Sequence, residues 1–188
     1  MQSVNHSEAR KERIYLAGFM GSGKSTVGPI LANTIGYTFA DLDRLIEAAE
    51  GIPVTAIFRT KGEEYFRALE REQVRIASQR PRFVLALGGG TLGDPENLDL
   101  IIGTGILVYL RVSLDLLVLR LQHRQDRPLL MDDEGNRLAP PLLRERIGQL
   151  LEQREHLYNR ASVIVDVDER RVGITVDRLV KVLHPFLR

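Results

Sequence analysis

Gly18-Phe19-Met20-Gly21-Ser22-Gly23-Lys24-Ser25 matches the pattern Gly-x4-Gly-Lys-Ser/Thr of a phosphate-binding loop. An apolar run at 14–19, interrupted only by Gly18, is typical of a buried parallel strand. Apolar residues at helical spacing follow from Lys24 to Ile35. Strand, loop and helix are the context that this motif requires. The alternative, a glycine-rich turn with a surface lysine, does not account for the flanking pattern.

The residue types in this loop indicate how it binds phosphate. Glycines let backbone N–H groups turn inward around phosphate oxygens, and the start of the following helix adds a positive dipole. Lys24 can reach the outer phosphates, and the hydroxyl of Ser25 can bind Mg²⁺. The loop therefore predicts a site for ATP and Mg²⁺.

The rest of the chain alternates between predicted strands and helices. Strands are predicted at 38–40, 83–87, 106–110 and 162–167; helices are predicted from Arg44 and at 63–77, 96–102, 114–121, 142–157 and 172–187, with a break or short helical turn at 53–58. This alternation predicts a three-layer α/β/α fold with a five-stranded parallel sheet and ligands at the carboxyl ends of its strands.

The domain organisation follows from the polar segments. Residues 1–13 are polar and predict a disordered tail, and 14–188 predict a single domain. Residues 123–141 are polar, rich in turn formers and long for a loop in a compact domain. Such a segment is typical of a mobile lid over a binding site.

A magnesium-linked acid is expected near the phosphate loop, but the strand at 83–87 runs into Gly88-Gly89-Gly90. Asp41-Leu42-Asp43 closes the second strand instead. One of these carboxylates could hold the waters of a magnesium ion, and the other could accept a hydroxyl proton. The alternative makes Asp43 the cap of a helix that begins at Arg44, and Asp41 a solvated neighbour.

Composition excludes several classes of protein. The 188 residues include 26 basic and 25 acidic side chains, so the net charge of +1 offers no electrostatic case for binding nucleic acid. The chain has no apolar run long enough to cross a bilayer, and no cysteine for disulfides or zinc. The four histidines show no metal-ligand spacing. We expect a cytoplasmic monomer without membrane or nucleic-acid partners.

A set of short motifs, spread in order over nearly the whole chain, resembles the shikimate kinase family. The set comprises the phosphate loop, Asp41-Leu42-Asp43, Phe66-Arg67, Gly88-Gly89-Gly90, Arg127-Pro128-Leu129-Leu130 and Arg154 before Leu157-Tyr158. The resemblance implies a P-loop kinase of the nucleoside-monophosphate-kinase type with a mobile lid. It also implies phosphorylation of the 3-hydroxyl of shikimate by ATP and Mg²⁺.

The resemblance implies a role for each matching residue. On the nucleotide side, phosphate and adenine contacts fall to Gly21, Ser22, Gly23, Lys24, Ser25, Thr26, Arg120, Arg127 and Arg170, and magnesium contacts to Ser25 and Asp41. Arg127 closes from the lid onto the transferring phosphoryl group. On the acceptor side, the residues are Asp43, Arg67, Gly89 and Arg154. Two arginine forks are well suited to the carboxylate of an acid, and Lys24, Asp43 and Arg127 form the implied catalytic set.

Several alternatives remain open at this point. Arg67 or Arg154 could be a surface residue of an amphipathic helix, or Glu70 could orient Arg67 within the site. Arg124 and Arg171 could replace Arg120 and Arg170 beside the adenine. The segment after Arg127 is longer and more acidic than the usual lid of this family.

Other functions would share the phosphate loop. A kinase for gluconate would differ only in the acid site. An adenylate-kinase-like enzyme normally has proline in place of Met20 and glycine in place of Ser25. A nucleotide-dependent switch would require a strand-end acid after Leu87, or a guanine motif, and the sequence has neither.

Overall fold

The computed structural model describes residues 12–123, 128–131, 136 and 138–187. Within these residues, five parallel strands form one sheet in the order β2-β3-β1-β4-β5. The strands are β1 (Arg13–Ala17), β2 (Thr38–Asp41), β3 (Phe83–Ala86), β4 (Ile106–Val112) and β5 (Val163–Val167). The predicted α/β fold with a five-stranded parallel sheet is confirmed.

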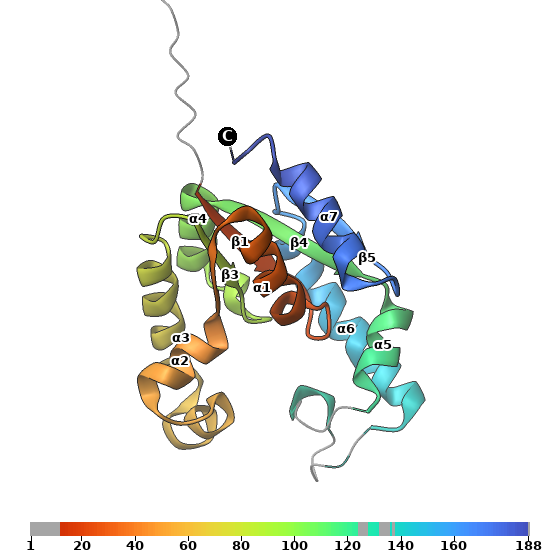
Figure 1. Ribbon diagram of the computed structural model, residues 1–188. Coiled ribbons are helices and arrows are strands. Elements are labelled where there is room, and N and C mark those ends of the chain that lie inside the picture. Colours follow the sequence, from red (N-terminus) through yellow and green to blue (C-terminus); the bar gives the residue numbers. More distant parts are fainter. Residues whose placement is uncertain (1–11, 124–127, 132–135, 137, 188) are drawn as a thin grey trace, which may run out of the picture.

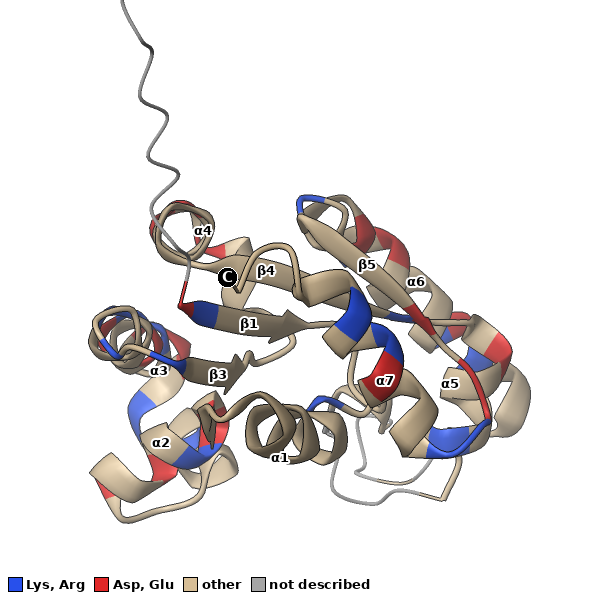
Figure 2. Cartoon of the chain, turned by 45° about the horizontal axis from the view of Figure 1, so that its top comes forward, with Lys and Arg blue, Asp and Glu red and all other residues tan. Residues whose placement is uncertain are grey.

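Helices cover both faces of the sheet (Figure 1). They are α1 (Lys24–Ile35), α2 (Leu42–Glu50), α3 (Val54–Ala77), α4 (Pro95–Thr104), α5 (Leu114–Leu121), α6 (Pro140–Tyr158) and α7 (Val172–Leu183), with short 3₁₀ turns η1 (Thr91–Gly93) and η2 (Pro128–Leu130). Charges of both signs are interspersed along the helices, whereas β3 carries none (Figure 2). The helices shield the central strands from water on both faces of the sheet.

The alternation of side chains in β1 explains why its sequence is hydrophobic from Ile14 to Ala17. Ile14 and Leu16 pack into one core with apolar residues of α1 and α7, while Tyr15 and Ala17 pack into the other with residues of α2, α3 and α4. A strand that is buried on both faces has no position for a polar side chain. The two cores hold the carboxyl ends of the strands in one row.

The start of α2 differs from the prediction. The helix begins at Leu42 rather than Arg44, and its N-cap is Asp41, whose Oδ1 accepts the backbone N–H of Asp43 at 3.1 Å. The alternative in which Asp43 caps a helix from Arg44 is therefore wrong. Asp41 is the last residue of β2 and keeps an extended backbone, so the strand passes into the helix without a loop.

The predicted break at 53–58 and the predicted helix at 63–77 belong to one bent element, α3. The bend lies at Gly62, whose φ of 84° and ψ of 173° are not helical. A positive φ is readily adopted only by glycine, so this residue permits the two helical segments to meet at an angle.

The lid prediction falls partly outside the described residues. Residues 1–11 and Arg127 are among those that the structure does not describe, so the predictions for the tail up to residue 11 and for this arginine stay predictions. Arg13, which was predicted to end the tail, is instead the first residue of β1. Of the segment 123–141, Leu130 is buried and packs into the same core as α6. None of the helices in the described part of the chain has the length and apolarity needed to cross a membrane.

Candidate active site

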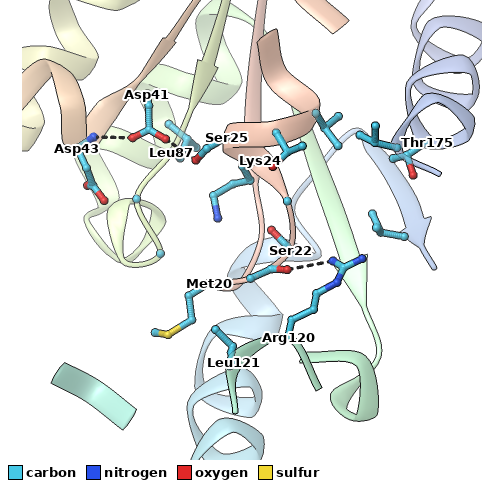
Figure 3. Close-up of a pocket in the computed structure, with 18 of the residues that line it drawn as sticks. Met20, Ser22, Lys24, Ser25, Asp41, Asp43, Leu87, Arg120, Leu121 and Thr175 are labelled. Atoms are coloured by element: carbon cyan, nitrogen blue, oxygen red, sulfur yellow. Dashed lines mark hydrogen bonds between the residues drawn. The ribbon is translucent and has the colours of Figure 1, made fainter. Parts of the chain in front are cut away.

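A cavity of about 430 Å³ opens at the carboxyl ends of the strands (Figure 3). The phosphate loop and the start of α1 form its floor, with Asp41 and Asp43 on one side. Gly88 and Gly89 lie beside these acids, and Arg120 and Arg170 line the opposite end. The cavity therefore joins the nucleotide side to Asp43 and Gly89 of the predicted acceptor side, whereas Arg67 and Arg154 are not among its lining residues.

The backbone of the phosphate loop requires its glycines. Gly18, Gly21 and Gly23 have φ values of 144°, 79° and 97°, which other residues rarely adopt. A Cβ on Gly18 would also lie only 2.8 Å from the carbonyl oxygen of Leu110. No side chain caps the start of α1, and this end of the helix lines the cavity, where its dipole favours an anion.

Lys24 lies over this loop. Its Nζ donates hydrogen bonds to the carbonyl oxygens of Gly18, at 2.7 Å, and Phe19, at 3.3 Å. The ammonium group therefore stands at the rim of the phosphate cradle, with its side chain directed into the cavity in Figure 3. A cation in this place suits the outer phosphates of a nucleotide.

Ser25 and Asp41 form a pair of oxygen ligands beside the loop. The Ser25 hydroxyl donates to Oδ2 of Asp41 at 2.6 Å, while Oδ1 of the same carboxylate caps α2. The cap therefore fixes the carboxylate that faces the serine. Magnesium in kinase sites is usually held by one or two protein oxygens, with waters and phosphate oxygens completing the shell, so these residues fit Mg²⁺. The described residues include no cluster of three or more His, Asp or Glu side chains suited to a metal.

Each glycine of the turn Gly88-Gly89-Gly90 lies against a different side chain of the predicted acceptor site. A Cβ would lie 3.3 Å from Oδ1 of Asp43 at Gly88, 3.0 Å from Nη1 of Arg154 at Gly89, and 3.0 Å from Nη2 of Arg67 at Gly90. The turn therefore brings together all four predicted acceptor residues: Asp43, Arg67, Gly89 and Arg154. Any larger residue would displace one of these polar groups.

Arg67 is held by carboxylates of its own helix. Its Nη1 donates to Oε2 of Glu70 at 2.7 Å, and its Nε and Nη2 lie 3.3 and 3.1 Å from Oε1 of Glu63. Glu70 is only 1% exposed, and its other oxygen accepts a 2.6 Å hydrogen bond from the hydroxyl of Thr91. Glu70 thus orients Arg67, which is one of the alternatives that the sequence left open.

Arg154 is half-buried, near the end of α6, with its guanidinium 5.9 Å from the centre of the Phe19 ring. The ring belongs to the phosphate loop, so the acceptor side directly adjoins the nucleotide side. A solvated residue on an outer helix face would not make these contacts. Arg154 is therefore not a solvated residue of an outer helix face, and its role in the site stays a prediction.

Arg120 and Arg170 meet at the other end of the cavity. Arg120 donates to the carbonyl oxygens of Gly21, at 3.0 Å, and Asp168, at 3.3 Å, and Arg170 pairs with the Asp168 carboxylate at 2.5 Å. This hydrogen bond with Arg170 lowers the pKa of Asp168. Of the described residues, Arg170 lines the cavity and Arg171 does not; Arg124 lies outside the described part.

Sequence reasoning missed some residues of the site. Thr91, Glu63 and Asp168 had no predicted role, and Tyr158, whose hydroxyl reaches Gly89, was noted only as part of a motif. The spacing of Glu63 and Arg67 was a detectable helical ion-pair signal. The remaining contacts join segments that are distant in the sequence, so no local sequence pattern predicts them.

A parallel sheet with a phosphate loop, an oxygen pair for Mg²⁺ and two arginines against a neighbouring glycine turn defines a small-molecule P-loop kinase. The sequence profile described as "Shikimate kinase" matches residues 20–184. The chain belongs to the shikimate kinase family. The predicted enzyme class and the cofactors ATP and Mg²⁺ are thereby confirmed.

Relatives and solved structures agree with this assignment. The shikimate kinase of Chlorobium phaeobacteroides is 43% identical over 175 residues, which cover 93% of this chain and 92% of the relative. The shikimate kinase structure from Bacteroides thetaiotaomicron has a TM-score of 0.82 at 32% identity, covering 92% of this chain and 98% of that one. The shikimate kinase from Acinetobacter baumannii in complex with shikimate has a TM-score of 0.81 at 31% identity, with coverages of 94% and 96%.

The rival of the same fold is more distant. A gluconokinase from Sinorhizobium meliloti 1021 has a TM-score of 0.50 at 25% identity. The fold relation explains why a gluconate kinase was a reasonable alternative, and the family match decides against it.

Proposed function

We propose that this enzyme transfers the γ-phosphoryl group of ATP to the 3-hydroxyl of shikimate and releases ADP and shikimate 3-phosphate. The observation that carries the proposal is the convergence of Asp43, Arg67 and Arg154 on one glycine turn beside the phosphate loop. Two arginines and a carboxylate suit a substrate that carries both an acid group and hydroxyls. The shikimate complex of the Acinetobacter relative supports the same acceptor.

The acceptor is held by opposite charges at opposite ends. Arg67 and Arg154 bind its carboxylate through planar forks, and Gly89 presents backbone to the ring because it has no Cβ in the way. Asp43 lies on the side of the turn that faces the phosphate loop and binds the hydroxyls. The ring is thereby turned so that one hydroxyl faces the phosphates.

Transfer needs no covalent nucleophile from the protein. The oxygen of the substrate hydroxyl bonds to the γ-phosphorus, and Asp43 accepts the proton of that hydroxyl. The bond between the γ-phosphorus and the β,γ-bridging oxygen breaks, which releases ADP. Lys24 offsets charge on the outer phosphates. Mg²⁺, held by Ser25 and through waters by Asp41, supplies further neutralisation of the phosphate oxygens when bound. Arg127, which lies outside the described residues, is proposed to close onto the transferring group.

The nucleotide lies across the loop toward α7. The phosphates lie against residues 21–26, which line the cavity, and Arg120 and Arg170 flank the adenine. We also propose that the enzyme is a monomer and that it acts in the cytoplasm, where ATP is available.

An ADP-release assay tests the proposal with shikimate, gluconate and no acceptor. We expect rapid ADP release only with shikimate, and phosphorus NMR of the product should show the new ester on the 3-oxygen. Equal rates with and without acceptor would instead indicate an ATPase or switch. Faster release with gluconate would reassign the acid site.

A further inference from the structure

Tyr158, the last residue of α6, is tied to the glycine turn although its ring is buried in the core. It is 2% exposed, and its hydroxyl donates a 3.0 Å hydrogen bond to the carbonyl oxygen of Gly89. The two residues are 69 positions apart in the sequence. The contact therefore connects the end of α6 to the backbone of the proposed acid site.

The core fixes the position of this hydroxyl. The Tyr158 ring stacks on that of Tyr109 from β4, with ring centres 5.0 Å apart and planes 27° from parallel. Tyr109 is itself only 1% exposed, so neither ring can turn without disturbing the core. Burial raises the pKa of Tyr158, despite the opposing effect of Arg154, and the group remains a proton donor at neutral pH.

Gly89 has particular need of such a contact. Three consecutive glycines leave the backbone with many accessible conformations, because a glycine has no side chain of its own to restrict φ and ψ. Tyr158 holds the carbonyl oxygen of Gly89, while Arg154, one helical turn earlier, lies 3.0 Å from the position of a Cβ on the same residue. One turn of α6 thus contacts Gly89 through both a binding residue and a hydroxyl that does not face the cavity.

We propose that Tyr158 is a positioning residue for the acceptor: it fixes the Gly89 peptide so that the acid pocket is formed before the acid arrives. The inference rests on the proposed function, since it concerns the pocket assigned there to shikimate. Binding is tighter when a flexible segment is already ordered, because less conformational entropy is lost on association. The hydroxyl should therefore affect acceptor affinity rather than the nucleotide or the transfer step.

The experiment compares Tyr158→Phe with Tyr15→Phe. Tyr15 is a matched control because it is 1% exposed and its hydroxyl is hydrogen-bonded to the half-buried Thr104 at 2.8 Å. Tyr15 is the middle residue of β1 and Thr104 is the last residue of α4, and neither lines the cavity. Both variants lose one buried hydroxyl and keep the ring. KM for the acid, KM for ATP, kcat and Tm are measured for each.

For Tyr158→Phe we expect KM for shikimate to rise about twofold to tenfold, the effect of one net hydrogen bond, with KM for ATP and kcat within about twofold of the parent enzyme. Tyr15→Phe should lower Tm about as much as Tyr158→Phe does, but it should leave both KM values unchanged. An unchanged KM for shikimate in Tyr158→Phe would overturn the proposal. So would equal rises in both KM values, because that pattern indicates general disruption of the site.

A second variant guards against a folding defect. Replacing Tyr158 by 4-aminophenylalanine keeps the ring and a donor in the same place, so KM for shikimate should return close to the parent value. Failure of this replacement to lower KM below that of Tyr158→Phe would also overturn the proposal. If the parent enzyme phosphorylates another acid instead of shikimate, the proposed function fails, and the same comparison made with that acid still tests Tyr158.

Discussion

Nη1 of Arg67 lies 2.7 Å from Oε2 of Glu70, a carboxylate that is 1% exposed. The printed sequence places these residues three apart, as in many surface pairs, but the burial of Glu70 makes this pair a fixed support. Contacts with Glu70 and Glu63 use three of the five donors of Arg67. Within the described structure, one N–H on each terminal nitrogen remains for an incoming carboxylate.

Replacing Arg67 or Arg154 by Lys keeps the charge but removes the planar fork. A hydrogen bond to a charged group contributes roughly 1.5 to 3 kcal/mol, so kcat/KM for shikimate should fall about tenfold to a hundredfold. KM for ATP should hardly change. Arg75→Lys is the matched control, because Arg75 is an exposed residue of the same helix as Arg67. An unchanged kcat/KM for shikimate in both Arg67→Lys and Arg154→Lys would contradict the assignment of the acceptor site.

Glu70→Gln keeps the shape of the buried side chain and removes its charge. Arg67 and the Thr91 hydroxyl then lose a charged acceptor, and we expect about 1 to 3 kcal/mol of lost stability. For a chain of this size, that change lowers Tm by several degrees. KM for shikimate should rise with it, because Arg67 is no longer oriented. A lower Tm with unchanged kinetics would mean that Glu70 is only a structural partner.

Asp41→Asn separates the capping role of this residue from its metal role. Asparagine caps helices about as well as aspartate, so the start of α2 and the Tm should be preserved. The neutral amide is a weaker magnesium partner than a carboxylate, and we expect kcat to fall about tenfold or more at low Mg²⁺. Titration with Mg²⁺ should recover part of the activity. Identical magnesium curves for the two proteins would place the metal elsewhere.

Lys24→Ala should abolish phosphoryl transfer. The outer phosphates lose their cation in a partly enclosed cradle, where electrostatic stabilisation is the main catalytic effect. Thermal melting should show a folded protein, because the hydrogen bonds of Lys24 to Gly18 and Phe19 lie within the loop itself. Lys61→Ala, which removes an exposed lysine of α3, provides the comparison. Near-normal turnover with a normal Tm would remove this loop from the catalytic site.

Arg120→Ala should weaken ATP binding selectively. Arg120 connects the phosphate loop at Gly21 to the turn at Asp168, so its loss frees one wall of the nucleotide site. We expect KM for ATP to rise about tenfold, the loss of contacts from a charged donor, with KM for shikimate unchanged. This result would be the converse of the Arg67 result. A rise in KM for shikimate alone would contradict the division of the cavity into two sides.

Much of the fold could be predicted because the relevant signals are local. The range predicted for α1 agrees with the structure at both ends, since its start follows the phosphate loop and Gly36 ends it with a φ of 73°. The start of α2 was misplaced because two nearby aspartates can both cap a helix, and sequence spacing does not say which one does. The bend at Gly62 was likewise taken for a gap between elements.

The sequence by itself determined the chemistry of the site, because the phosphate loop is a contiguous motif with a mechanism and Asp41 follows a recognisable strand. Only the tertiary structure decided that Arg67, Arg154 and Tyr158 lie against one turn, with buried Glu70 and Thr91 hydrogen-bonded beside it. These contacts depend on how α3 and α6 pack against the sheet. Packing is set by the sum of many apolar contacts along the chain. The residues next to Arg67 or Arg154 in the sequence therefore do not show where these side chains lie in the fold.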